Sequence, residues 1–382
     1  MFRSASIVLC TAVAALVVLG LVMLASTSAW VKNVENEYHF LTRQSTMLAV
    51  GLVGAVFLSR LDPIWLRRGW PYALAALCVL LVLCFVPGVG VAELGSARWI
   101  KVPVLGKFQP SELAKIVGIV AMAGWFARWQ TETHTFWRGF IIPGILIGVP
   151  VALIAVETDV GSALSLSVAA AAVFFCVGTR LFYLVPVALT GMAGAAFFVH
   201  SNQNRWSRIV AWMDLENPYH QINKGMQQWR ALLAFGNGGP DGVGLGNGVE
   251  KFGTLTYAHI DFIFPVVGEE LGLPFTLGTI LCYVVIAVAG CSISMQAATI
   301  FDRCLALGLT CVIVVPAMVN IAVTTAVLPN DGLPLPFVSF GGTSLLISLG
   351  AVGLLCGIHR RSRPVDYKPL PVAGLRSYAV KL

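Results

Sequence analysis

Long apolar runs separated by short polar stretches divide the chain into segments of membrane-spanning length. A helix needs about 20 mostly apolar residues to cross the hydrocarbon core of a bilayer. The second run is short and contains Gly51 and Gly54, so its ends are the least well defined by sequence. The pattern predicts ten such helices, at residues 5–27, 45–61, 70–89, 112–128, 140–157, 160–178, 181–200, 263–293, 304–327 and 341–358.

The composition supports this interpretation and indicates the fold class. Of the 382 residues, 57% are hydrophobic and 11% are charged, whereas a soluble domain carries roughly 25% charged residues. The chain is therefore predicted to be an all-α integral membrane protein, with one polytopic domain at 1–358 and a short basic tail at 359–382. The first run follows Arg3 as in a signal peptide, but it is long enough to span the membrane. The nine cysteines lie in or beside apolar runs and form no CxxC pair, which is typical of small buried hydrophobes.

Basic residues orient the predicted helices. An even number of spans puts both termini on one side, and a cytoplasmic N-terminus leaves 14 of the 25 Lys and Arg residues on cytoplasmic segments. This topology explains the net charge of +7, and no nucleic-acid motif is present. The outer side carries two basic groups, which predict an anionic ligand there. They are Arg98, Lys101, Lys107 and Lys115 after the third helix, and Arg205, Arg208, Lys224, Arg230 and Lys251 in the long loop 201–262.

Two stretches place carboxylates beside apolar helices. In "QPSELAK" (109–115), Pro110 and Ser111 start a helix and put Glu112 and Lys115 on one face. This pair is either a helix-end ion pair or part of a site in the membrane, where an unpaired ammonium is costly. In "AHIDFIFPVVGEELG" (258–272), Asp261 precedes the apolar run and is either a helix cap or a functional carboxylate at the outer surface. Glu269 and Glu270 lie more than two turns deeper, so at least one of them faces the bundle interior.

Three further stretches are irregular or amphipathic. Trp and Arg alternate with polar residues in the loop 201–262. This pattern is typical of a segment that anchors at the membrane interface or that binds a lipid head group. The Gly-rich segment 236–248 lacks the G-K-[ST] ending of a phosphate loop and is interpreted as a flexible turn-rich loop. "LPNDGLPLPFVSFGGTSLL" (328–346) cannot form a regular helix, so it is predicted to cap a site. Its candidate capping residues are Pro334, Pro336, Ser339, Gly341 and Gly342.

Together these stretches resemble the signatures of the SEDS family of bacterial cell-wall proteins, which includes FtsW, RodA and SpoVE. The motifs occur in the family's order, between about residues 95 and 346. "GVGLGNGVEKFGTLTYAHIDFIF" and "DGLPLPFVSFGG" are more similar to the division-type FtsW branch, with the elongation-type RodA branch as the nearest alternative. The sequence departs from the family pattern at Ile260, where Thr is usual, at Phe340, where Tyr is usual, and at Asn330–Asp331, where Thr-Lys is common.

The resemblance implies an activity and roles for the charged residues. SEDS proteins polymerise lipid II into glycan strands on the outer face of the bacterial cytoplasmic membrane, by inverting transfer to the 4-hydroxyl of the acceptor sugar. That reaction needs one general base, for which we expect Asp261, and positive charge for a pyrophosphate leaving group. Glu112 would orient Lys115 or bind a metal. Whether a divalent cation (Mg²⁺ or Mn²⁺) binds at Asp261 or Glu112 is left open. The expected pyrophosphate ligands are Arg98, Lys115, Arg205, Arg208 and Lys251.

The family also implies partners, and other classes of function stay open. The expected partners are lipid II, the growing glycan strand, membrane lipids, a class B penicillin-binding protein and other divisome or elongation proteins, but no nucleic acid. The transpeptidase is expected to dock near the eighth and ninth helices. The main alternative is a lipid II flippase, which would place its critical charges near the membrane midplane, often in inverted repeats. A non-catalytic scaffold would leave the outer basic groups unexplained.

Overall fold

The computed structural model describes residues 4–28, 38–93, 96–102, 106–252, 255 and 257–362. Within these residues, ten helices are long and apolar enough to cross a membrane, which confirms the predicted number of spans, although the third begins and ends earlier than the predicted 70–89. They are α1 (Ala5–Ser28), α2 (His39–Arg60), α3 (Pro63–Leu83), α4 (Pro110–Arg128), α5 (Ile142–Val156), α6 (Val160–Val177), α7 (Leu181–His200), α11 (Ile263–Gln296), α12 (Ile300–Thr324) and α13 (Gly342–Arg361). A π-helical turn at Trp137–Ile141 extends α5 at its start. Most of the basic tail, 363–382, lies outside the described residues.

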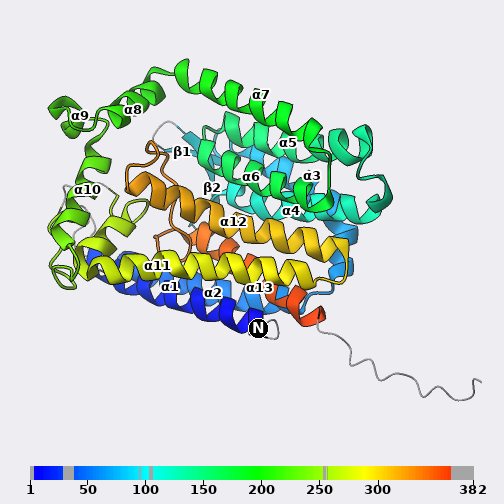
Figure 1. The fold of residues 1–382 in the computed structure, drawn as a ribbon, viewed down its shortest axis with the longest axis horizontal. Helices are drawn as coiled ribbons and strands as arrows, with labels where there is room; N and C mark the ends of the chain where they lie inside the picture. The colour runs from blue at the N-terminus through cyan, green and yellow to red at the C-terminus, as the bar shows by residue number, and fades with distance from the viewer. Residues whose placement is uncertain are drawn as a thin grey trace, which may run out of the picture.

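The spans form one bundle whose helices run in roughly the same direction across the molecule (Figure 1). Helix α12 packs against α4, α6 and α11, while α13 packs on α2 and α1 packs on α11. Helices α4, α12 and α13 are the most buried spans. By contrast, α7 lies along the edge of the bundle and has no buried side chain between Phe182 and His200, so it presents apolar surface on all sides.

Glycines bring neighbouring spans close together. Without a hydrophobic driving force between helices in lipid, packing depends on small residues that let backbones approach. A Cβ atom on Gly353 of α13 would lie 2.3 Å from the backbone oxygen of Ala55 on α2. Gly51 packs in the same way against Leu349, so the glycine that interrupts the apolar pattern of α2 is an interface residue within a continuous helix.

A small antiparallel sheet covers one end of the bundle. Its strands β1 (Gly90–Glu93), β2 (Ser96–Val102) and β3 (Gly106–Phe108) are adjacent in chain order. Ile100 is paired with Phe108, and a register shift between Val91 and Ala92 marks a bulge. The sequence predicts a loop in this segment, and that prediction is wrong because strands this short carry too little alternation to be recognised. We call this end of the molecule the sheet end.

The long connection between α7 and α11 is also folded. It contains α8 (Gln203–Met213), α9 (Pro218–Ile222) and α10 (Met226–Gly238), which lie beyond the sheet end of the bundle (Figure 1). The side chain of Asn202 caps α8 by accepting hydrogen bonds from the backbone N–H groups of Asn204 and Arg205. Helix α10 packs on α11. Trp212 of α8 donates a hydrogen bond to the backbone oxygen of Ala326, 2.8 Å away, and so ties the connection to the end of α12.

A break in α11 holds the Gly-rich segment in place. Gly272 has φ 76° and ψ −169°, a backbone conformation that residues other than glycine rarely adopt. At this break the backbone N–H groups of Val243 and Gly244 donate to the carbonyls of Glu269 and Glu270, at 2.9 and 3.0 Å. The turns predicted for the Gly-rich segment are present, and two backbone hydrogen bonds attach them to α11.

The start of α1 and the end of α13 lie together at the end of the bundle opposite the sheet, which we call the terminal end (Figure 1). The Sγ atoms of Cys10 and Cys356 are 3.6 Å apart there. The described part of the membrane domain therefore begins and ends on one side, as an even number of spans requires.

The close contact between α2 and α13 predicts that Gly353→Ala destabilises the bundle. The new methyl group would overlap the Ala55 carbonyl, and overpacking of this kind costs about 1–3 kcal/mol. The matched control is Gly278→Ala in α11, where a Cβ atom meets nothing within 4 Å. Thermal unfolding in detergent should show a lower midpoint for the first variant and an unchanged or higher midpoint for the control. Equal midpoints for the two variants would contradict this account of the interface.

Candidate functional site

Six charged side chains from five parts of the chain gather at the sheet end. Arg98 and Arg208 act electrostatically on both Asp261 and Asp331, and Arg205 acts on Asp331. The sequence predicts four of these residues for the site, while it leaves the role of Asp159 open and does not predict Asp331. We call this group the arginine–aspartate cluster. It comprises Arg98, Asp159, Arg205, Arg208, Asp261 and Asp331.

Arg98 enters the cluster from strand β2. Its guanidinium lies 4.3 Å from the ring centre of Trp99, and its Nη1 atom is 4.0 Å from Oδ1 of Asp159. A guanidinium stacked on an aromatic ring stays partly desolvated while it keeps its charge. Among the described residues its Nε atom is buried and has no hydrogen-bond partner, so the side chain has a free donor.

Asp159 anchors the start of two spans. It is the N-cap of α6, and its carboxylate accepts hydrogen bonds from Gln109 Nε2 at 2.7 Å and from Ser111 Oγ at 2.8 Å. Its neighbour Thr158 has φ 68°, a strained conformation for a residue with a branched side chain. Asp159 thus fixes α4 against α6 and at the same time holds Arg98 in place.

Asp261 lies in the turn that leads into α11. Asn320 of α12 donates to the backbone carbonyls of both Asp261 and Leu333, each at 2.7 Å, which fixes this turn against the loop before α13. The carboxylate is largely withdrawn from water, and its Oδ1 atom has no hydrogen-bond partner among the described residues. Burial raises the pKa of Asp261 to about 7, although a hydrogen bond from its own backbone N–H and the charges of Arg208 and Arg98 oppose that rise. A buried carboxylate with one unpartnered oxygen and a pKa near neutrality is suited to accept a proton.

Asp331 adds a third carboxylate that sequence reasoning misses. It lies in the loop between α12 and α13, and its Oδ2 atom would be 2.5 Å from a Cβ atom on Gly161 of α6. Burial, and after it the charge of Asp159, raises the pKa of Asp331 to about 6, while the three arginines of the cluster oppose the rise. In the sequence the residue is only a departure from the family pattern, so no local signal identifies it.

Arg205 and Arg208 reach the cluster from α8. The Arg205 guanidinium lies 4.0 Å from the ring centre of Phe198, and its Nη1 atom is buried without a hydrogen-bond partner among the described residues. Burial lowers the pKa of Arg205, and the like charge of Arg208 lowers it further. Two guanidinium groups that repel each other, one of them with a buried N–H that has no partner among the described residues, are suited to bind an anion with several oxygens.

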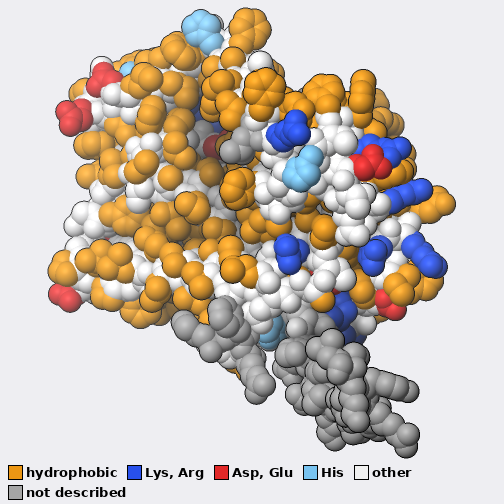
Figure 2. Space-filling view, turned by 45° about the vertical axis from the view of Figure 1, so that its right-hand side comes forward, with side chains coloured by type: hydrophobic (Ala, Val, Ile, Leu, Met, Phe, Trp, Pro, Cys, Tyr) orange, Lys and Arg blue, Asp and Glu red, His pale blue; other side chains and the backbone are white. Residues whose placement is uncertain are grey.

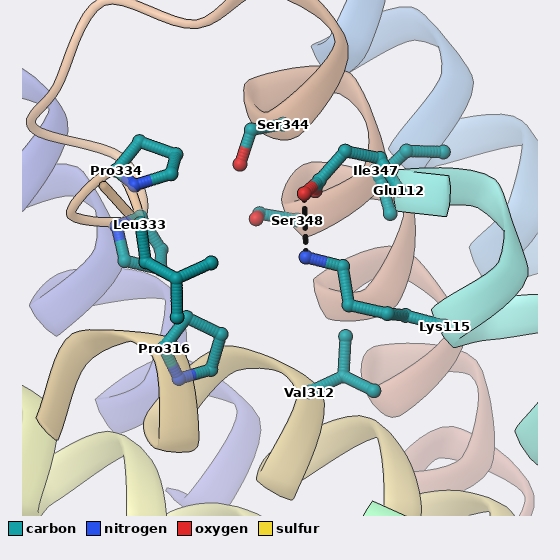
Figure 3. Close-up of a pocket in the computed structure, with 10 residues that line it drawn as sticks. Glu112, Lys115, Val312, Pro316, Leu333, Pro334, Ser344, Ile347 and Ser348 are labelled. Atoms are coloured by element: carbon teal, nitrogen blue, oxygen red, sulfur yellow. Dashed lines mark hydrogen bonds and ion pairs between the residues drawn. The ribbon is translucent and has the colours of Figure 1, made fainter. Parts of the chain in front are cut away.

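Glu112 and Lys115 form a separate pocket beneath the same loop (Figure 3). Lys115 Nζ donates to Glu112 Oε1 at 2.6 Å, and both side chains are buried. Ser344 and Ser348 of α13 lie beside this pair, and Leu333 and Pro334 of the loop lie across the pocket from it. The cavity, of about 10 Å³, is large enough for roughly one water molecule. This ion pair therefore lies next to the loop, in a pocket whose lining includes no residue of the cluster.

The predicted capping loop is held at both ends and near its middle. The backbone carbonyl of Pro336 accepts a hydrogen bond from Tyr283 of α11 at 2.5 Å. The Ser339 hydroxyl accepts one from the N–H of Leu335 at 2.8 Å. Gln44 of α2 donates to the Ser339 carbonyl at 3.1 Å and accepts from the N–H of Gly341 at 3.3 Å. Pro334 lies over the Glu112–Lys115 pocket, and Gly342 begins α13 beside Met47 of α2.

Lys251 lies in a different environment from the arginines. Its ammonium donates to Glu270 Oε1 at 2.6 Å, to the Gly246 carbonyl at 2.7 Å and to Ser26 Oγ at 2.8 Å. The side chain is 1% exposed and that of Glu270 is 0% exposed. All three donors of the ammonium are therefore used, and the expected contact of Lys251 with pyrophosphate is corrected to a buried pair that holds the Gly-rich segment. Glu269 has a similar role, since it accepts from the N–H of Val249 at 3.0 Å.

His259 does not act with Asp261 as a titrating pair. Its ring lies 4.6 Å from the ring of Phe40 and 6.2 Å from that of Phe340, measured between centres. Burial lowers the pKa of His259 to about 4, so the imidazole is neutral at physiological pH. The imidazole is buried and packs among these aromatic rings.

Among the residues that the structure describes, the side chains form no cage for a metal ion. Within the described ranges, no three His, Cys, Asp or Glu side chains gather closely enough to hold one. The candidate ligands Asp261 and Glu112 lie in the cluster and in the separate pocket, respectively. A divalent cation therefore remains a prediction from the sequence, and we derive no step through it.

Comparison with known proteins gives a consistent set of similarities. A family model described as a cell cycle protein, and named for FtsW, RodA and SpoVE, matches residues 7–364. A probable peptidoglycan glycosyltransferase FtsW from Geobacter metallireducens is 36% identical over 353 residues, covering 91% of this chain and 93% of that protein. A protein of the same description from Pseudomonas fluorescens is 37% identical, covering 91% of this chain and 86% of its own length.

Solved structures match over nearly the whole fold. A chain from a peptidoglycan synthase complex, described in terms of coordinated polymerization and crosslinking, superposes with a TM-score of 0.76 and 26% identity. That match covers 93% of this chain and 98% of the other. The crystal structure of the rod shape determining protein RodA from Thermus thermophilus gives a TM-score of 0.69 at 26% identity, over 93% of this chain and 96% of that one.

The environment of Lys251 predicts a structural role for it. Lys251→Met would leave the Glu270 carboxylate buried and unpaired, which costs about 3–5 kcal/mol of unfolding free energy. The double variant Lys251→Met/Glu270→Gln, which removes both charges, should recover most of that stability. The midpoint of thermal unfolding in detergent is measured for the single and the double variant. Lys224→Met is the control, because it removes an exposed lysine from the same connection. A single variant as stable as wild type would contradict the assignment.

Proposed function

The chain belongs to the family of cell cycle proteins named for FtsW, RodA and SpoVE, and we propose that it is a peptidoglycan glycosyltransferase that polymerises lipid II at the sheet end of its membrane domain. The observation that supports this best is the arginine–aspartate cluster. It contains a carboxylate with one unpartnered oxygen, on Asp261, and three guanidinium groups, two of which have buried atoms without a partner among the described residues. The reaction needs a base and an anion-binding group, and the cluster contains both.

Asp261 is the general base in this proposal. The 4-hydroxyl of the acceptor sugar gives its proton to the Asp261 carboxylate while its oxygen forms a bond to the anomeric carbon of the donor. The bond from that carbon to the lipid diphosphate breaks, and the diphosphate leaves with the electron pair, so the configuration is inverted. The leaving group is already anionic, so one carboxylate suffices, whereas a glycosidase uses two. The raised pKa of Asp261, about 7, gives the carboxylate the basicity that proton transfer requires.

Arg98, Arg205 and Arg208 bind the diphosphate in this proposal. They come from β2 and α8, and Arg98 and Arg208 both act electrostatically on Asp261, so an anion bound by these two lies near the base. Charge-assisted hydrogen bonds from guanidinium groups suit phosphate oxygens and strengthen as negative charge develops on the leaving group. Asp159 positions Arg98 for this role.

Glu112 and Lys115 stabilise the loop next to the site in this proposal, and they do not contact the substrate. Their ion pair lies under the loop that carries Asp331 and Pro334, and Asn320 connects the same loop to the turn of Asp261. We therefore assign Lys115 a positioning role through the loop, in place of direct contact with pyrophosphate in the resting state.

The biological setting follows from the relatives. The curated relatives quoted above are named FtsW, which favours a role in cell division over the elongation role of RodA. We place the protein in the bacterial cytoplasmic membrane with both termini in the cytoplasm, so that the sheet end faces outward and meets lipid II there. A class B penicillin-binding protein is the proposed partner, by analogy with the peptidoglycan synthase complex that the fold matches.

The proposed base predicts the effect of Asp261→Asn. Loss of a general base lowers the rate by roughly 10²–10⁴-fold, so glycan polymerisation from purified lipid II should nearly disappear. Wild-type activity should fall as pH drops below about 7, because the carboxylate becomes protonated, and the residual activity of the variant should not follow that curve. Asp241→Asn, at an exposed position, is the control. Undiminished polymerisation by a folded Asp261→Asn variant would rule out the base, and absence of polymer from wild type with its partner would favour a flippase.

Asp331 gives a second prediction, on substrate binding. At pH 7.5 its carboxylate is ionised, because its pKa is about 6, and its charge opposes the diphosphate. Asp331→Asn should therefore tighten binding of labelled lipid II roughly 3- to 10-fold at that pH. At pH 5 the wild-type side chain is mostly protonated, so the two affinities should converge. Equal affinities at pH 7.5, or a difference that persists at pH 5, would show that Asp331 does not act through its charge.

A further inference from the structure

A second group of cations lines a cavity at the terminal end of the bundle. The cavity has a volume of about 380 Å³ and lies between the start of α3 and the end of α4. Helix α4 begins at the sheet end and ends here, so a full membrane span separates this cavity from the arginine–aspartate cluster. The lining residues are Ile64, Arg67, Arg68, Gly124, Ala127 and Arg128.

Aromatic rings hold two of the three arginines in position. The Arg67 guanidinium lies 5.9 Å from the ring centre of Phe301, a buried residue at the start of α12. The Arg128 guanidinium lies 5.7 Å from the ring centre of Trp129. Contacts of this kind restrict long side chains without neutralising their charge. The cations of the cavity are therefore partly preorganised before any ligand arrives.

No carboxylate neutralises these arginines within the part of the chain that the structure describes. The nearby acidic groups have other partners: Glu132 pairs with Arg138, and Asp302 pairs with Arg361 at 2.9 Å. Asp62 accepts a hydrogen bond from the N–H of Ile64 at 2.9 Å and so caps its own helix. Guanidinium groups do not lose their proton in proteins, so three positive charges face one cavity and repel one another. An anion in the cavity would relieve that repulsion.

The surroundings of the cavity are those of the membrane surface. Ile64 is 49% exposed and Trp65 is 73% exposed on α3, a span with few buried residues. Exposed Trp next to arginines is typical of the head-group level of a bilayer. Figure 2, which brings the terminal end forward, shows most of the visible Lys and Arg side chains on the right-hand half among hydrophobic ones. A ligand of this cavity therefore meets both cations and apolar surface.

We propose that Arg67, Arg68 and Arg128 bind the phosphate of an anionic phospholipid from the leaflet at the terminal end. The phosphate lies among the three guanidinium groups, and the glycerol and first acyl carbons lie against Ile64 and Ala127. Arginine suits this ligand because its planar fork matches phosphate oxygens, and basic pockets between membrane helices are known to bind anionic lipid head groups. The proposal does not depend on the glycosyltransferase activity.

The test is lipid retention by the intact protein in detergent, measured by native mass spectrometry. Phosphatidylglycerol is the probe, phosphatidylcholine is the zwitterionic comparison and inorganic phosphate is the soluble competitor. Wild type should retain phosphatidylglycerol in preference to phosphatidylcholine, and the variant Arg67→Gln/Arg68→Gln/Arg128→Gln should lose that preference, by roughly fivefold in affinity per arginine. The matched control is Arg60→Gln, an exposed arginine at the same end that does not line the cavity.

Each other outcome overturns the proposal. A triple variant that keeps the preference shows that the lipid binds elsewhere, and equal loss in Arg60→Gln shows that diffuse surface charge is responsible. Displacement of phosphatidylglycerol by millimolar-range inorganic phosphate would identify a soluble phosphate site instead of a lipid site. If the triple variant does not fold, the single variant Arg128→Gln is measured against Arg60→Gln with the same criteria.

Discussion

The free-energy cost of withdrawing charge from water shapes this structure more than any single contact. In a membrane bundle an ionised side chain is stable only with an opposite charge or a full set of hydrogen bonds. Lys251 and Glu270 meet this condition with each other, with Ser26 and with a backbone carbonyl. Lys115 and Glu112 also meet it as a buried pair. The first pair holds the Gly-rich segment through the Gly246 carbonyl, and the second lies in a pocket under the loop before α13.

The arginine–aspartate cluster is the place where this condition is met only in part. Three arginines and three aspartates balance in number, yet buried atoms of Arg98, Arg205 and Asp261 have no partner among the described residues. Burial then raises the pKa of Asp261 to about 7 and that of Asp331 to about 6, so the charge of the cluster changes near physiological pH. An incompletely satisfied polar cluster is costly for folding, and such costs are found mainly at functional sites.

The sequence predicts the membrane fold well because the signal for each span is local. Runs of apolar residues define all ten helices, and Pro110 with Ser111 correctly predicts the start of α4. The sheet of β1 to β3 is missed because its strands are short, and the roles of Lys251 and Asp331 are missed for a different reason. Their partners lie far away along the chain: Ser26 contacts Lys251, and Gly161 and Arg208 lie near Asp331. Only the packed bundle brings such residues together.

Asn320 has a consequence for how the two halves of the site respond to force. Its single amide group holds the backbone of Asp261 and of Leu333 to α12, one of the most buried spans. Arg205 and Arg208, by contrast, belong to α8, which extends beyond the bundle (Figure 1). Helix α8 is nevertheless tied to the end of α12 by the hydrogen bond from Trp212 to the Ala326 carbonyl. A load applied to α8 is therefore carried to the same helix that holds the Asp261 backbone, so the positions of the two arginines and of Asp261 are coupled through one span.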